Sequence, residues 1–205
     1  MRLGVTQRVE KNVHRSETID TLDQQIVSIL SSCGLTAIPI PNTLEIENAT
    51  KNKNIDDWIR DVDLEGFVLT GGQDFGAQPN RDKLEMHILN FASKRKMPLL
   101  GICRGMQMMA IWAGESLHKI EGHVKTRHMI RGKINRDVNS YHNFALSNCP
   151  KQFHVLAKSA DGQIEAIVHE NLSWEGWMWH PEREADFATE DLERIKNIFV
   201  GKKFS

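Results

Sequence analysis

The residues best suited to carry a reaction in this chain are a cysteine and a histidine that each follow an apolar run. Cys103 lies in "GICRGMQ" (101–107), with glycines two positions away on either side. His180 follows "GWMW", and Glu182 comes two residues later, across Pro181. A thiolate is a nucleophile, an imidazole can take and return a proton, and a carboxylate can orient that imidazole. These residue types indicate covalent acyl transfer.

The sequence around Cys103 is typical of a strand that turns sharply into a helix. The apolar run "MPLLGIC" precedes the turn, and "RGMQMMAIWAG" has the composition of a helix that Gly114 ends. A helix N-terminus favours a thiolate over a thiol. The backbone N–H of Arg104 would then face a developing oxyanion. A small buried cysteine at a tight turn is the alternative interpretation, as a surface histidine beside a carboxylate is for His180.

A second glycine-rich segment, "LTGGQD" (69–74), also follows an apparent strand. Its adjacent glycines can expose backbone N–H groups to an anionic ligand or an oxyanion. On its own, such a segment is more often simply a turn.

The order of apolar segments predicts an α/β fold. Short buried strands are expected at 3–6, 35–41, 66–70 and 97–103, with helices at 19–33, around 84–92 and at 104–114. The polar segment 42–63 is expected to be a loop or an exposed helix. Alternating strands and helices indicate a mainly parallel sheet with helices on both faces.

The second half of the chain indicates antiparallel strands instead. "FHVLAKS" (153–159) and "QIEAIVHE" (163–170) flank the turn signal at 161–162, and 174–182 contains one more strand. Thr189 is a plausible N-cap for a last helix. No repeat or linker divides the chain, so we expect a single domain over residues 1–205.

Composition excludes several classes of function. The sequence has 26 Lys and Arg against 27 Asp and Glu among 205 residues, which argues against a general nucleic-acid binder. No apolar run is long enough for a transmembrane helix, so no membrane partner is expected. "MRLGVTQRVE" lacks the apolar core of a signal peptide, which predicts a cytoplasmic protein. Three widely spaced cysteines form neither a disulfide framework nor a CxxC motif.

Three other features have more ordinary interpretations. His118, His123 and His128 recur every five residues, a spacing that places ligands on no single helix or strand face, so no metal site is expected. Trp177 and Trp179 share a strand parity, which favours core packing over a substrate platform. The basic stretch "KTRHMIRGK" (125–133) is expected to be a solvated loop, although it could face an anionic group.

Taken together and in this order, the motifs resemble the class I glutamine amidotransferase family. "LTGGQD", "GICRGMQ" and "MWHPE" correspond to its oxyanion strand, cysteine elbow and His-x-Glu, and the resemblance covers nearly the whole chain. More narrowly, "GICRGMQMMAIWAGESLH", "VNSYHN" and "SADGQIEAIVHE" resemble the γ-glutamyl hydrolase branch, which includes γ-glutamyl-GABA hydrolases. The resemblance implies a flavodoxin-like, three-layer α/β/α fold with an added antiparallel region.

The resemblance also implies roles for individual residues. Cys103, His180 and Glu182 match the catalytic triad of the family. The implied oxyanion hole is formed by the backbone N–H groups of Gly72 and Arg104, and the implied substrate-binding residues are Gln107, Tyr141 and His142. The branch often has a glutamine where this chain has Asn143. The stretch between Leu117 and Asn139 is also short, which predicts a more open pocket for the leaving amine.

The implied activity is hydrolysis of a γ-glutamyl amide through a γ-glutamyl thioester, with no metal or organic cofactor. Expected substrates are γ-glutamyl amines or nucleotide amidates such as γ-glutamyl-CDP-amidate in capsule polysaccharide biosynthesis, and the basic stretch tilts towards a phosphorylated leaving group. One alternative is a glutaminase subunit that delivers ammonia to a separate synthase. Another is a non-catalytic binding or regulatory module. The sequence does not identify the amine that is released or the pathway, and it does not decide between a monomer and a homodimer.

Overall fold

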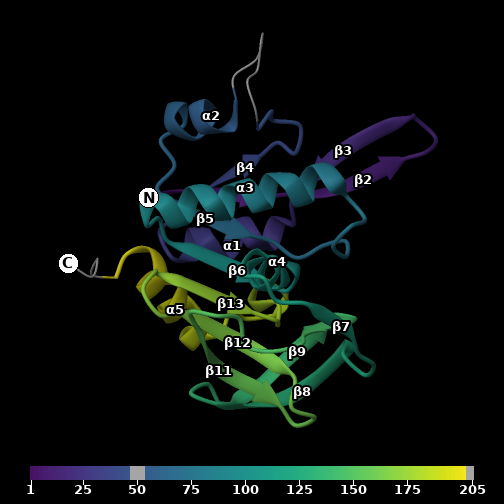
Figure 1. Ribbon diagram of the computed structural model, residues 1–205, viewed down its shortest axis with the longest axis vertical. Helices are drawn as coiled ribbons and strands as arrows, with labels where there is room; N and C mark the ends of the chain where they lie inside the picture. The colour runs from purple at the N-terminus through teal and green to yellow at the C-terminus, as the bar shows by residue number, and fades with distance from the viewer. Residues whose placement is uncertain (47–53, 202–205) are drawn as a thin grey trace.

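The computed structural model describes residues 1–46 and 54–201, and its centre is a nine-stranded mixed sheet (Figure 1). The strand order is β4-β1-β5-β6-β13-β12-β11-β8-β9. The parallel strands are β1 (Arg2–Thr6), β4 (Thr36–Ile40), β5 (Gly66–Leu69), β6 (Leu99–Ile102) and β13 (Trp174–Trp177). The antiparallel strands are β12 (Ile164–His169), β11 (Phe153–Ser159), β8 (Val124–Gly132) and β9 (Arg136–Tyr141). We call these two sets the parallel half and the antiparallel half.

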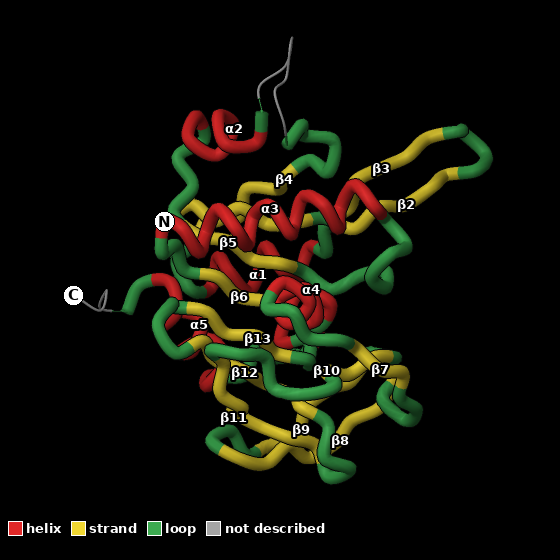
Figure 2. Tube along the Cα trace, viewed as in Figure 1, coloured by secondary structure: helices red, strands yellow, loops and turns green. Residues whose placement is uncertain are grey.

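Helices cover both faces of the parallel half, as Figure 2 shows. On one face, α1 (Gln24–Ser32) and α5 (Thr189–Phe199) share a buried apolar cluster with β1. On the other face, α2 (Ile55–Asp61), α3 (Pro79–Arg95) and α4 (Arg104–Trp112) share a second cluster. In chain order, the five parallel strands follow the 2-1-3-4-5 arrangement of flavodoxin-like sheets. The predicted three-layer α/β fold with a parallel core and an antiparallel addition is therefore confirmed.

The strands next to the elbow are apolar because both of their faces are covered. Phe67, Val68 and Leu69 of β5 are completely buried, as parallel strands between two helix layers usually are. Trp177 and Trp179 are also buried, and their rings stack with centroids 5.2 Å apart. The core-packing interpretation of these two tryptophans is confirmed.

The helix predicted to begin at Ile19 begins later, and the prediction was wrong for its first residues. Residues 8–21 form a hairpin of β2 (Arg8–Asn12) and β3 (Glu17–Thr21) that projects from the sheet (Figure 1). Ile19 lies in β3 and is 41% exposed. The helix begins only after Asp23, whose carboxylate accepts a hydrogen bond from the Gln25 N–H. Capping by Asp23 outweighs the three- and four-residue spacing that seemed to extend the helix.

Two other predicted elements also change in detail. The polar segment 42–63 includes α2, which is not an exposed helix because Ile55 and Ile59 are buried; residues 47–53 lie outside the described part. Thr189 is the first residue of α5, and Ala188 takes the N-cap position without a side-chain hydrogen bond.

The region 115–150 holds strands that the sequence patterns did not reveal. The basic stretch 125–133 is not a loop, since most of it forms β8, which pairs with β9. A small second sheet joins β7 (Leu117–Lys119) to β10 (Phe144–Leu146). Among the described helices, none has the length and apolar content needed to cross a bilayer.

Candidate active site

Cys103 occupies a strained turn between β6 and α4. Its backbone has φ 52° and ψ −105°, a conformation that non-glycine residues rarely adopt. The turn packs so tightly that a Cβ on Gly105 would lie 2.1 Å from the carbonyl oxygen of Leu69, and one on Gly101 would lie 2.7 Å from the carbonyl carbon of Gly105. The glycines around Cys103 are therefore required by close backbone approach, and the turn has the form of a nucleophile elbow.

His180 reaches the same edge of the sheet because β13 runs parallel to β6. Ile102 pairs with Trp177, and the Cys103 N–H donates to the Trp177 carbonyl oxygen at 2.7 Å. Three residues after Trp177, the Nδ1 atom of His180 lies 2.7 Å from Oε1 of Glu182. Both side chains of this pair are almost fully buried. The structure thus brings the predicted histidine and carboxylate together beside the elbow.

The pKa of His180 reports its contact with Cys103. Burial lowers this pKa, but the negative charge of Cys103, a hydrogen bond with Cys103 and the interactions with Glu182 outweigh burial and raise it from 6.5 to about 9. At neutral pH the imidazole is therefore protonated while it faces the sulfur. Such a pair has the proton already on the group that can deliver it to a leaving amine.

Asn139 fixes the backbone of His180, a role that the sequence did not reveal. The His180 N–H donates to Oδ1 of Asn139 at 2.9 Å, and Nδ2 of Asn139 donates to the His180 carbonyl at 2.7 Å. The same Nδ2 donates to Glu184. On its other side the imidazole lies against bare backbone, because a Cβ on Gly71 would come within 2.6 Å of the His180 ring. The imidazole therefore has little freedom to leave the sulfur.

The segment after β5 carries the predicted oxyanion donor Gly72. Leu69 pairs with Gly101, so this segment leaves the sheet next to the elbow. Gly72 has φ 147°, and a Cβ there would lie 2.3 Å from Nη1 of Arg81. The other predicted donor, Arg104, is the first residue of α4, where backbone N–H groups have no partner within the helix. The structure brings both positions to the elbow, and their oxyanion role stays a prediction.

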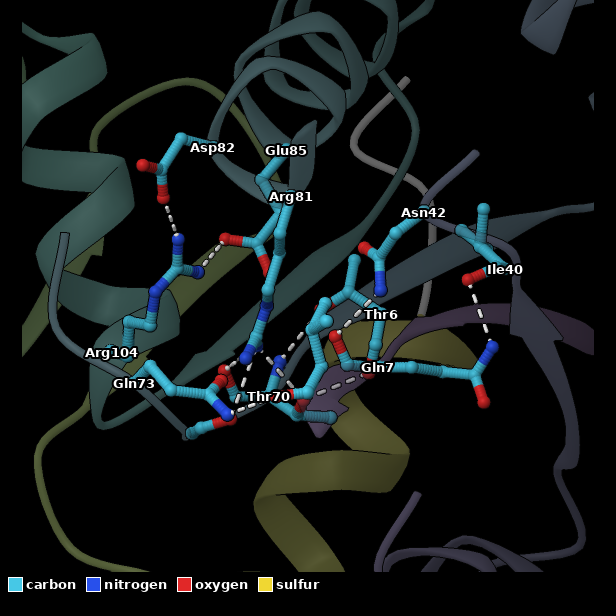
Figure 3. Close-up of polar contacts among 12 residues, drawn as sticks. Thr6, Gln7, Ile40, Asn42, Thr70, Gln73, Arg81, Asp82, Glu85 and Arg104 are labelled. Atoms are coloured by element: carbon cyan, nitrogen blue, oxygen red, sulfur yellow. Dashed lines mark hydrogen bonds and ion pairs between the residues drawn. The ribbon is translucent and has the colours of Figure 1, made fainter. Parts of the chain in front are cut away.

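A buried ion network holds this segment in place (Figure 3). Nη2 of Arg81 donates to the carbonyl oxygens of Thr70 and Gly71, at 2.7 and 3.1 Å. Nε of Arg81 donates to Glu85 at 2.9 Å, and the Arg104 side chain donates to both Glu85 and Asp82. We call Arg81, Asp82, Glu85 and Arg104 the arginine network. No sequence motif marked this role, which depends on the first turns of α3 and α4 lying together.

The three predicted substrate-binding residues occupy different surroundings. Tyr141 is 38% exposed, and its ring meets that of His180 edge to face at 5.7 Å between centroids. Gln107 is buried, and its Nε2 donates to the Phe144 carbonyl. The side chain of His142 is also buried, with Nδ1 3.0 Å from that same carbonyl oxygen. Contact of these residues with a glutamyl group stays a prediction.

Comparison with known proteins places this geometry in a family. The family model "Glutamine amidotransferase class-I" matches residues 17–201. A γ-glutamyl-CDP-amidate hydrolase of Campylobacter jejuni is 34% identical over 127 residues, which span 59% of this chain and 64% of that protein. One of the subunits of a glutamine-hydrolysing GMP synthase from Methanocaldococcus jannaschii is 26% identical, over 85% of this chain and 90% of its own length.

Solved structures share the fold. A glutamine amidotransferase from Thermotoga maritima superposes with a TM-score of 0.63 at 16% identity, covering 96% of this chain and 80% of the other. The match of the family model over most of the sequence decides the assignment. The chain belongs to the class I glutamine amidotransferase family.

Proposed function

We propose that this protein hydrolyses the γ-amide of a γ-glutamyl compound and releases glutamate and an amine. The observation that carries this proposal is the geometry of the elbow, where the strained Cys103 turn lies beside the buried His180 and the imidazole is hydrogen-bonded to Glu182. A cysteine with only a packing role would not require a strained turn beside a buried histidine–glutamate pair. The γ-glutamyl hydrolase of Campylobacter jejuni supports this choice of reaction within the family.

In the first half of the reaction, the Cys103 thiolate adds to the γ-carbonyl carbon. The carbonyl oxygen becomes an oxyanion that the backbone N–H groups of Gly72 and Arg104 stabilise. Loss of one such donor in comparable enzymes costs about 3–4 kcal/mol of transition-state stabilisation. His180 then gives its proton to the leaving nitrogen, the C–N bond breaks, and a γ-glutamyl thioester remains on Cys103.

In the second half, neutral His180 takes a proton from water. The hydroxide formed in this way adds to the thioester carbonyl, the C–S bond breaks, and glutamate leaves. Glu182 keeps the imidazole in the tautomer that presents Nε2 to the sulfur and stabilises its charged form. Gln107, Tyr141 and His142 belong to the segments that we propose bind the glutamyl end, and no metal or organic cofactor takes part in these steps.

The test is glutamate release from a panel of γ-glutamyl amides and free glutamine, with Cys103→Ala as the blank. We expect turnover of at least one γ-glutamyl amide by the native protein, and a loss of roughly 10⁴-fold or more in the blank, as for removal of other nucleophiles. Equal product formation by the two proteins would refute the assignment of Cys103.

A glutaminase subunit is the second candidate, favoured by the similarity to the archaeal GMP synthase component over 90% of that protein. Such a subunit should hydrolyse free glutamine slowly alone and much faster with a synthase partner. The same panel separates the two candidates, because a free-standing hydrolase prefers a substituted γ-glutamyl amide and needs no partner.

A phosphorylated leaving group is a finer proposal within the first function. Of the basic residues on β8, Arg127 is already paired with Asp137 and Glu184, and Arg131 lies opposite Lys158. Lys125 follows Val124, which pairs with Tyr141 next to His180. Lys125→Ala should raise KM for a γ-glutamyl phosphoramidate and leave KM for an uncharged γ-glutamyl amine unchanged. An equal change for both substrates would remove the basis for a phosphate contact.

A further inference from the structure

A second group of convergent polar side chains lies in and next to the strands of the antiparallel half. It consists of His123, His128, His142 and Glu165, and we call it the histidine cluster. Oε1 of Glu165 lies 3.4 Å from Nδ1 of His123, 3.3 Å from Nε2 of His128 and 3.7 Å from Nε2 of His142. Nδ1 of His123 and Nε2 of His142 are 3.2 Å apart. Four donor atoms therefore point into one small volume.

An irregularity in β8 explains why the five-residue spacing of His123 and His128 is misleading. In a regular strand, residues five apart point to opposite faces. The register of β8 against β9 shifts between Val124 and Thr126, and Lys125 between them has φ 54°. This bulge adds one residue without advancing the side-chain alternation, so both histidines reach the same face. His118 lies on β7, is exposed, and stays outside the cluster.

The outer nitrogens of two histidines are held by acceptors. Nε2 of His123 lies 3.0 Å from a carboxylate oxygen of Asp161, and Nδ1 of His142 lies 3.0 Å from the Phe144 carbonyl oxygen. Each outer nitrogen must carry a proton to make its bond, so in the neutral rings each inner nitrogen presents a lone pair. Two lone pairs then face each other across 3.2 Å. That contact is repulsive unless a proton or a metal ion lies between them.

The centre of the cluster also contains polar atoms that lack hydrogen bonds. Glu165 is 1% exposed, and within the described residues neither of its carboxylate oxygens has a hydrogen-bond partner; the same holds for Nε2 of His128. Buried polar atoms are normally satisfied, and a buried carboxylate is the most costly exception.

The geometry points to a binding site for a divalent first-row transition metal ion of the Zn²⁺ type, with His123, His128, His142 and Glu165 as ligands. Tetrahedral Zn²⁺ with metal–ligand distances of about 2.0–2.1 Å places its ligand atoms roughly 3.3–3.4 Å apart. Four of the separations given above lie between 3.2 and 3.7 Å. The donor atoms of His123, His128 and Glu165 all lie within 4.8 Å of one another, and His142 would join them through its short separations from His123 and Glu165.

The surrounding contacts resemble the outer shell of a metal site. Metal-binding histidines usually donate their second N–H to a carboxylate or a backbone carbonyl, as His123 and His142 do here. Three imidazoles with one carboxylate favour Zn²⁺ and its neighbours over Mg²⁺ or Ca²⁺, which prefer all-oxygen sites. With an ion bound, the two inner nitrogen lone pairs of His123 and His142 would both point at a positive charge and would no longer repel each other.

A metal at this place would stiffen the wall of the active site. His142, with one ring nitrogen on the ion and the other on the Phe144 carbonyl, would then support that wall rather than contact the glutamyl group through its side chain. His142 and Gln107 share the Phe144 carbonyl as acceptor. The Glu165 carbonyl accepts a hydrogen bond from the Met178 N–H, two residues before His180. The ion would thus tie β8, β12 and the segment after β9 to the strand that leads to His180.

The test is calorimetric titration of Zn²⁺ into the full, untagged chain after treatment with a chelator. A Cys103→Ala background removes the thiolate, so that zinc held at the elbow is not counted and the result does not depend on catalysis. We expect one equivalent to bind and the melting temperature to rise with Zn²⁺ concentration. His128→Gln and Glu165→Gln should each weaken binding at least about tenfold, since outer-shell changes alone cost 10–100-fold. The matched control, His118→Gln, should bind as the parent does.

Absence of saturable binding, or equal affinity in all four proteins, would overturn the proposal and leave a protonated histidine–glutamate network as the account of the cluster. X-ray absorption of the zinc-loaded Cys103→Ala protein provides a readout that needs no further variant. Imidazole nitrogen at about 2.0 Å supports the site, whereas a shell without imidazole contradicts it.

Discussion

Each half of the sheet has a buried glutamate in or beside it, and the two glutamates differ in the side chains that surround them. Beside the parallel half, on α3, Glu85 is completely buried and accepts hydrogen bonds from Arg81 and Arg104. In the antiparallel half, Glu165 is almost as deeply buried and lies near three histidine rings, but its carboxylate oxygens have no hydrogen-bond partner among the described residues. Arginine cannot give up its charge, whereas histidine can. Glu85 therefore forms ion pairs that persist at every working pH, whereas Glu165 lies among imidazoles that can be neutral and can bind a cation.

The largest contrast is expected from removing each charge in turn from the metal-free protein. Glu85→Gln leaves the buried guanidinium of Arg81 without its ion-pair partner and leaves Arg104 with Asp82 alone, so it should lower the free energy of unfolding by about 3–5 kcal/mol. Glu165→Gln should lower it by less than half as much, because His128 can lose its proton. Urea denaturation at neutral pH measures both. Equal losses in the two variants would erase the distinction between the halves.

The pH dependence of the Glu85 effect sharpens this contrast. Burial raises the pKa of Glu85, but Arg81 and Arg104 outweigh it and lower the pKa below its ordinary value of 4.5. A lowered folded-state pKa gives stability that is present above pH 4.5 and is lost as the pH falls towards the folded-state value. The difference in unfolding free energy between the native protein and Glu85→Gln should therefore shrink in acid. A difference that stays constant down to the acid transition would contradict the assignment of charge.

A smaller effect is expected from changing Glu182, the carboxylate that orients His180. Glu182→Gln removes one of the interactions that raise the pKa of His180 to about 9. We expect kcat to fall by roughly 10²-fold or more, as for other triads that lose the orienting carboxylate. The alkaline limb of kcat/KM should move to lower pH, because the imidazolium that faces Cys103 becomes easier to deprotonate. The control is Glu170→Gln, a change of an exposed residue just after β12, which should leave the pH profile of kcat/KM unchanged. If the alkaline limb of kcat/KM stays at the same pH in Glu182→Gln, the proposed role of Glu182 is contradicted.

The smallest predicted effect concerns the contact between the two halves. Asn139 lies on β9 in the antiparallel half and holds the backbone of His180 through two hydrogen bonds. Asn139→Ala should lower kcat about tenfold, the effect of losing roughly 1.4 kcal/mol of positioning, with little change in KM. Asn171→Ala, in the loop after β12, should leave both constants unchanged. A loss of kcat that merely follows the loss of folded protein would reduce Asn139 to a structural residue.

The two halves of the sheet also differ in how much of their structure could be predicted from the sequence. In the parallel half, Cys103 and His180 were each predicted to follow a buried strand, but their pairing was implied only by the resemblance to the family. The parallel register of β13 against β6, which brings the two strand ends to one edge, had no signal in the local pattern. Arg81 and Asn139 were missed because the contacts that reach the site are with backbone atoms of other segments, the carbonyls of Thr70 and Gly71 and the backbone of His180, for which no residue pattern exists. Ile19 was misplaced because a helical spacing continued by chance across the capping residue Asp23.

In the antiparallel half, the histidine spacing led to the wrong geometric expectation for a specific reason. Residues five apart in a regular strand point to opposite faces, but the bulge at Lys125 breaks this alternation between His123 and His128. A bulge at a non-glycine residue leaves little trace in the sequence, and Glu165 comes from a strand 37 positions beyond His128. Long-range register, rather than any motif, assembles the histidine cluster.

The decisive experiment is to trap the proposed thioester on Cys103. The native protein is mixed with a γ-glutamyl amide that it turns over, quenched in acid and digested, and the peptide containing Cys103 is weighed by mass spectrometry. The account predicts that this peptide gains the mass of one γ-glutamyl group, that hydroxylamine removes it, and that Cys103→Ala carries no such adduct. Steady turnover with an adduct on another residue, or turnover by Cys103→Ala at the native rate, would contradict it.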